Sequence, residues 1–165
     1  MKIIPLKHSI ALAGLTATYL LAGASSLAAS STGLSADELL QSATGVLKEL
    51  DAGHYTAVWD SAALFVKASM PRDEFVVTIR RARMSLGAID HRGWSSVMRI
   101  QYTNATTFPN GLYANVDFST MLENGRVVYE LLSFKLESDG LWHLTGYVPR
   151  PSQDLRSSGS PLAKP

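Results

Sequence analysis

Apolar residues recur every three or four positions in the first half of the chain, which is the spacing of amphipathic helices. A first helix is predicted from Ser35, where Ser-Ala-Asp-Glu forms a capping box, to Gly53. A second helix is predicted over residues 54–68. A third is predicted to begin at Pro71, a residue favoured in a first helical turn, and to end at Gly87.

After Gly87 the apolar period falls to two, which is typical of strands with one buried face. We predict strands over residues 92–102, 112–121, 126–137 and 141–148. The last two connections read as three-residue loops that end in Gly125 and Gly140, each in a left-handed conformation. Such short connections make the four strands an antiparallel meander.

These loop lengths fix a strand register that gathers the apolar residues on one face. The other face is largely polar and carries Tyr113, Tyr129 and Tyr147, so we expect it to meet water or a partner. Three helices then cover the apolar face, giving an α+β fold with a curved, cone-like four-stranded antiparallel meander and any pocket between helices and sheet. The predicted pairs are Thr120/Val128, Phe118/Glu130, Val116/Leu132, Ala114/Phe134 and Leu112/Leu136, then Leu136/Trp142, Phe134/Leu144, Leu132/Gly146 and Glu130/Val148.

The N-terminus has the order of a secretory signal peptide: Lys2 and Lys7, an apolar run, then small residues. We predict cleavage near Ala28 and a periplasmic or secreted protein without a membrane anchor, because no lipid-bearing cysteine is present. The predicted organisation is a signal peptide (1–28), a short linker (29–34), one α+β domain (35–150) and a disordered Pro/Ser-rich tail (151–165).

The composition argues against several classes of function. Loss of the two signal lysines reduces 15 basic residues to 13, against 14 acidic ones, so we expect no nucleic-acid partner. The chain contains no cysteine, which excludes disulfides and thiol chemistry. The remaining histidines have no ligand-spaced partner, so we predict no metal and no cofactor.

Several runs together resemble an exported bacterial family called domain of unknown function 4019, over about residues 40 to 150. The resemblance implies a layout similar to the nuclear-transport-factor-2-like superfold, which hosts isomerases, dehydratases and binding or dimerisation modules, and so it implies no particular chemistry. Phe75 stands where the family has a Trp. The runs are Asp51-Ala-Gly53-His-Tyr55 with Trp59, Arg83-Met-Ser-Leu86-Gly87 with Arg92, Pro109-Asn-Gly111-Leu-Tyr113, and Asp139-Gly140-Leu-Trp142 with Gly146-Tyr147.

Glu130 is the one charged residue on the apolar sheet face, and such a charge needs a partner. We expect Arg83, at the edge of the third helix's apolar stripe, to be its neighbour. The two residues then form either a structural ion pair, which we favour, or a catalytic base with its electrophile. Arg92, where the sheet begins, could bind an anion, but an arginine at a strand end is more often a surface residue or a loop clamp, and we expect one of these roles.

Ligand contacts, if the cone is hollow, are expected from six residues: Tyr55, Trp59, Arg83, Tyr102, Phe118 and Glu130. Aromatic residues four positions apart on a helix, as Tyr55 and Trp59 are, more commonly belong to the hydrophobic core.

Three functions remain open. The favoured one is a non-catalytic module that binds a small apolar ligand or a protein partner. The alternatives are an acid/base enzyme, such as an isomerase, dehydratase or hydrolase, with Glu130 as base, and an accessory subunit that forms a homodimer through the sheet. The dimer alternative requires the three tyrosines of the polar face to form an exposed cluster.

Overall fold

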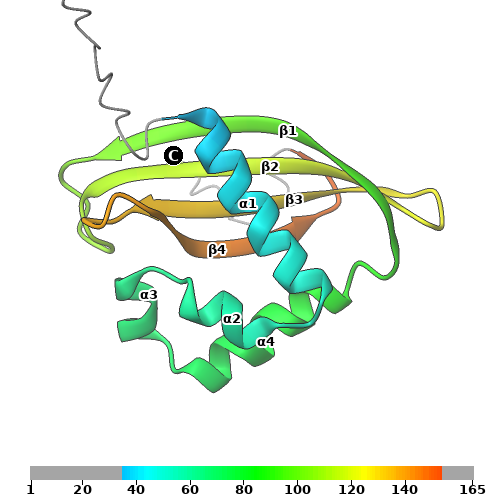
Figure 1. Cartoon of the computed structure of the whole chain (residues 1–165), viewed down its shortest axis with the longest axis horizontal. Coiled ribbons are helices and arrows are strands. Elements are labelled where there is room, and N and C mark those ends of the chain that lie inside the picture. The colour runs from blue at the N-terminus through cyan, green and yellow to red at the C-terminus, as the bar shows by residue number, and fades with distance from the viewer. Residues whose placement is uncertain (1–34, 154–165) are drawn as a thin grey trace, which may run out of the picture. The chain divides into compact units, whose positions relative to one another are not determined.

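The computed structural model describes residues 35–153, so the predicted signal peptide, linker and residues 154–165 lie outside it. Within that range, helices precede an antiparallel sheet of strand order β1-β2-β3-β4, which confirms the predicted α+β class (Figure 1). The elements are α1 (Ala36–Asp51), α2 (Tyr55–Asp60), α3 (Leu64–Ser69), α4 (Arg72–Met84), β1 (Ile89–Tyr102), β2 (Gly111–Leu122), β3 (Val127–Leu136) and β4 (Trp142–Arg150).

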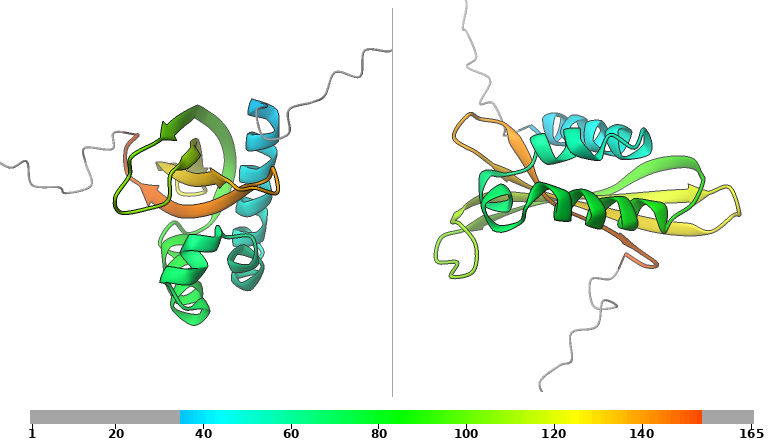
Figure 2. Two further views of the ribbon diagram at one scale, coloured as in Figure 1. Left: turned by 90° about the vertical axis from the view of Figure 1, so that its left-hand side faces the viewer. Right: turned by 90° about the horizontal axis from the view of Figure 1, so that it is seen from below.

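Helix α1 begins as predicted at Ser35, whose side chain accepts a hydrogen bond from the Asp37 amide at 3.1 Å. Its buried face carries Leu39, Ala43 and Leu47, which pack in the same core as the apolar residues of β2 and β3. The helix crosses one face of the sheet (Figure 1). The strands twist and curl, and all the described helices gather on one side of them (Figure 2).

The predicted second helix is wrong in one respect, because it is divided into α2 and α3. The intervening segment pairs with the edge of the sheet: Ala63 donates its amide to the Leu144 carbonyl at 2.9 Å, and Leu144 donates to Ser61 at 3.3 Å. These bonds satisfy backbone groups on β4, and this explains why the helix is interrupted there.

The predicted register of β2 and β3 is confirmed. Phe118 lies opposite Glu130 and Val116 opposite Leu132. Gly125 and Gly140 have φ values of 79° and 78°, as the three-residue loops require.

The register of β3 and β4 is confirmed only from Leu136 to Phe134, because a bulge follows. Beyond it, Leu132 lies opposite Tyr147 rather than Gly146, and Glu130 opposite Pro149 rather than Val148. A bulge puts one extra residue into one strand, so all later side chains on β4 change face. Tyr147 therefore lies on the core face, not on the polar face where the sequence predicted it.

Candidate functional site

Glu130 is completely buried, at 0 % exposed, and is held by four hydrogen bonds from three side chains. Its Oε1 accepts from Arg92 Nε and Thr120 Oγ1, both at 2.6 Å. Its Oε2 accepts from the Tyr147 hydroxyl at 2.6 Å and from Arg92 Nη2 at 3.4 Å. A carboxylate offers about four lone-pair positions, so Glu130 has no free position for a substrate proton.

Arg92 connects the sheet to the end of α1. It extends from β1, where its strand partner is Thr120, and its side chain is 15 % exposed. It donates to Glu130 on one side and, through both Nη atoms, to Asp51 on the other. Burial opposes its charge, but the bonds to Asp51 and Glu130 outweigh that effect and raise the pKa of Arg92 above its usual range.

Asp51 joins a second arginine to this group. Arg83 Nε donates to Asp51 Oδ1 at 2.8 Å, and Arg83 Nη1 donates to the Gly87 carbonyl at 3.1 Å. Partial burial raises the pKa of Asp51, but the hydrogen bonds from Arg92 and Arg83 outweigh it and hold that pKa below its usual value of 3.8. We call Asp51, Arg83, Arg92, Thr120, Glu130 and Tyr147 the Glu130 cluster.

The predicted direct pair of Glu130 and Arg83 is wrong. The ion-pair partner of Glu130 is instead Arg92, which was expected at the surface or as a loop clamp. Arg92 lies opposite Thr120 in the sheet, and Thr120 donates a hydrogen bond to Glu130. Arg83 reaches the end of α1 instead, and is linked to Glu130 by hydrogen bonds through Asp51 and Arg92.

Tyr147 enters the cluster because of the bulge in β4. Burial, and then the negative charge of Glu130, raise the pKa of Tyr147 well above its usual range, so its hydroxyl stays a donor. With two arginines and two carboxylates, the cluster is formally neutral. Its geometry is that of a closed structural network, and it holds no unpaired acid or base.

The other predicted ligand contacts are dispersed. Phe118 is buried in the core, and the Trp59 ring lies 5.3 Å from that of Phe75. Tyr102 packs against Phe108 and Tyr113 at the C-terminal end of β1. Arg92 lies near the N-terminal end of the same strand.

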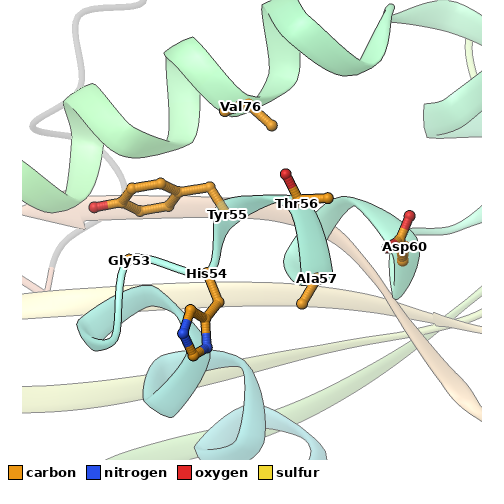
Figure 3. Close-up of a pocket in the computed structure, with 7 residues that line it drawn as sticks. All are labelled: Gly53, His54, Tyr55, Thr56, Ala57, Asp60 and Val76. Atoms are coloured by element: carbon orange, nitrogen blue, oxygen red, sulfur yellow. The ribbon is translucent and has the colours of Figure 1, made fainter.

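Tyr55 lines a separate open pocket of about 520 Å³ between α2 and α4, where the Thr56 side chain points toward Val76 of α4 and the Tyr55 ring extends to one side (Figure 3). The structure therefore does not bring the six residues into one site.

An apolar cavity of about 190 Å³ does lie between α3, α4 and β4. Its wall includes Tyr147, whose hydroxyl, with its raised pKa, donates to Glu130. Glu130 is not among the residues of the wall, so the cavity borders the cluster at Tyr147 without reaching the carboxylate. The apolar lining side chains are Val66, Met70, Phe75, Ile79, Ala82 and Val148.

Sequence reasoning missed Asp51, Thr120 and Tyr147. Thr120 was placed correctly on the apolar face beside Glu130, and a hydroxyl there was a readable signal. Gly146, inside a strand next to Tyr147, was a second signal, because such a glycine commonly marks a bulge. Asp51 begins one of the runs that carry the family resemblance, but nothing in the sequence assigned it a partner in the cluster.

The exposed tyrosine cluster is also wrong. Tyr113 and Tyr147 are both buried. Across residues 35–153, no group of three or more His, Cys, Asp or Glu side chains is arranged to hold a metal ion. In the same range, no helix has the length and apolar character of a membrane-spanning segment.

Comparison with known families gives one match. The family described as "Protein of unknown function (DUF4019)" matches residues 42–147, more than half of the chain, and this confirms the predicted resemblance to that family. The matched span contains the whole Glu130 cluster. No curated protein matches the chain.

Proposed function

The chain belongs to the DUF4019 family, and we propose that it is a non-catalytic module that binds a small apolar ligand in the cavity between α3, α4 and β4. The observation that carries the proposal is the contrast between this cavity and the Glu130 cluster. A base must reach the proton that it removes, and Glu130 is buried with both oxygens already bonded. The neighbouring cavity is open to a ligand and largely apolar.

The cavity has the chemistry expected for such a ligand. Aliphatic and aromatic side chains supply most of its wall, while Thr78 and Thr145 supply hydroxyls that can orient an amphipathic molecule. Its volume of about 190 Å³ suits a ligand the size of benzene, because apolar cavities of roughly 150 Å³ bind benzene.

We further propose export to the periplasm or beyond, after removal of residues 1–28, and kinship with the nuclear-transport-factor-2-like superfold. The order of charged, apolar and small residues at the N-terminus supports export. Helices packed on one side of a curled antiparallel sheet support the superfold.

The test is a titration of the mature protein with benzene and with 1-hexanol, followed by NMR chemical shifts. Both probes should shift the resonances of the cavity wall, such as those of Ile79 and Val148. Ala82→Leu places a larger side chain in the cavity and should abolish these shifts.

Val77→Leu is the matched control, because Val77 lies on the same helix but is exposed. It should bind both probes as the wild type does. The proposal fails if neither probe shifts these resonances in the wild type, or if Ala82→Leu binds as well as Val77→Leu.

A further inference from the structure

Another cavity, of about 310 Å³, lies where α1 and α2 meet the β4 side of the sheet. Its wall combines residues of both helices with Phe134 of β3 and with Trp142 and Leu144 of β4. It shares no wall residue with the apolar cavity between α3, α4 and β4. The two cavities are therefore separate sites, and what binds in one is independent of what binds in the other.

Helix α1 faces this cavity with a single stripe of residues. The members are Ser42, Gly45, Val46 and Glu49, whose spacing of i, i+3, i+4 and i+7 places side chains on one face of a helix. Ser42 is only partly buried, and the Glu49 side chain is 41 % exposed. A ligand entering from solvent can therefore reach the polar groups of this stripe.

Gly45 leaves open space in the middle of the stripe. A Cβ atom added there would meet nothing within 4 Å, so close packing does not require a glycine at this position. Glycine inside a helix is also less favourable than alanine. Neither packing nor helix stability explains Gly45, whereas an open cavity beside Val46 does.

The two serines of the wall can only accept hydrogen bonds from a ligand. Ser42 Oγ donates its proton to the Glu38 carbonyl at 2.9 Å, and Ser61 Oγ donates to the Val58 carbonyl at 2.9 Å. Each hydroxyl has one proton, which is used in this way, and keeps acceptor lone pairs. An anionic ligand would therefore find no donor in these side chains.

Glu49 gives the wall its charge, since no Lys, Arg or His residue is part of it. Glu49 Oε2 lies 2.9 Å from Nδ1 of His54, whose side chain is 65 % exposed. A carboxylate offers about four acceptor positions, so Glu49 can accept from a further donor. The indole N–H of Trp142 is buried and is not offered to a ligand.

We propose that this cavity binds a small primary ammonium ion that carries an apolar tail. An ammonium group has three donors and no acceptor, which matches a wall whose accessible polar side chains accept. It would donate to the partly exposed carboxylate of Glu49, and the tail would lie against Val46 and Leu144. This ligand class differs from the uncharged apolar ligand of the cavity between α3, α4 and β4.

The volume of the cavity sets the size of the probes. At about 30 Å³ per water molecule, 310 Å³ corresponds to roughly ten waters, or to a ligand of roughly ten non-hydrogen atoms. Phenethylammonium, phenethyl alcohol and phenylacetate are close to this size and share an aromatic tail. They differ in carrying a positive, a neutral or a negative head group.

The test titrates the mature protein with each probe and follows the NMR signals of Gly45 and Val58, two residues of the wall. Phenethylammonium should shift both signals with millimolar affinity. Because Glu49 is partly exposed, its charge should favour phenethylammonium by only about threefold over the alcohol and about tenfold over phenylacetate.

Glu49→Gln removes the charge of the wall and keeps the size of the side chain. It should weaken phenethylammonium about threefold and leave the alcohol unchanged, so that these two probes bind equally well. Asp37→Asn is the matched control, because Asp37 lies on the same helix but is exposed and is not part of the wall. This control should keep the preference for the ammonium ion.

Gly45→Leu fills the cavity and should abolish the shifts at Val58 with all three probes. The variant should fold, because its Cβ has free space and leucine favours a helix, and thermal melting checks this. Thr44→Leu is the control: Thr44 is the exposed neighbour of Gly45 and lies outside the wall. It should bind all three probes as the wild type does.

Four outcomes overturn the proposal. The first is a wild type in which no probe shifts Gly45 or Val58, including the case in which the probes shift only Ile79 and Val148 of the other cavity. The second is phenylacetate binding as tightly as phenethylammonium. The third is a Glu49→Gln variant that keeps the preference for the ammonium ion. The fourth is a folded Gly45→Leu variant that binds as Thr44→Leu does.

Discussion

Each face of the sheet buries an arginine–carboxylate pair, but one pair is more completely hydrogen-bonded than the other. On the helix-covered face, Glu130 accepts four hydrogen bonds and Arg92 continues the network to Asp51. On the other face, Asp117 and Arg150 share one direct hydrogen bond, and one polar atom of each has no partner among the described residues. Both pairs are buried, and they differ in how completely their polar atoms are hydrogen-bonded.

The largest expected effect comes from removing each arginine in turn. Arg92→Met leaves Glu130 completely buried without its ion-pair partner, and should lower the free energy of unfolding by about 4 kcal/mol. Arg150→Met should lower it by only about 2 kcal/mol, because a cavity lined by Asp117 and Arg150 can admit water to the stranded carboxylate. Urea unfolding measures both. Equal losses in the two variants would remove the distinction between the pairs.

A smaller effect is expected at Tyr147. Tyr147→Phe removes one donor to a buried carboxylate and should lower the free energy of unfolding by about 1.5 kcal/mol. Tyr129→Phe is the control, since Tyr129 lies partly exposed on the other face of the sheet. This variant should have nearly the same free energy of unfolding as the wild type. If the two variants are equally stable in urea, the Tyr147 bond contributes nothing.

The smallest effect is expected at Asp51, and it depends on pH. Because the folded-state pKa of Asp51 is below 3.8, its contribution to stability is present above about pH 4 and is lost as the pH falls through the lowered pKa. The side chain is 36 % exposed, so Asp51→Asn should cost only about 1 kcal/mol at neutral pH.

Urea unfolding from neutral pH down to about pH 3 should show this loss shrinking as Asp51 takes up its proton in the wild type. Asp60→Asn changes an exposed carboxylate at the end of α2 and should give a small, nearly constant difference. A loss for Asp51→Asn that grows on acidification would contradict the assigned direction of the pKa.

Local signals were sufficient for much of the fold. The capping box at Ser35 and the loop glycines Gly125 and Gly140 are short-range signals, and they correctly predicted the start of α1 and the register of β2 and β3. The break between α2 and α3 could not be predicted in this way, since it is caused by pairing with Leu144, which is distant in the sequence.

The candidate site could be predicted less fully from the sequence, because it too depends on contacts between residues that are distant in the sequence. Glu130 was identified correctly as a buried charge, but its partners depend on long-range geometry. A single-residue bulge moves Tyr147 to the core face, and the end of α1 brings Asp51 to Arg92. Arg83 was therefore assigned to the wrong carboxylate.

The most direct test of the account compares the wild type with Glu130→Gln by urea unfolding at neutral pH, with Glu123→Gln in an exposed turn as control. A structural cluster predicts that Glu130→Gln is less stable by about 3 kcal/mol, because Arg92 loses a buried counter-charge, while Glu123→Gln is unchanged. A Glu130→Gln variant as stable as the wild type, or more so, would contradict it. That result is expected of a carboxylate kept for function at the expense of stability.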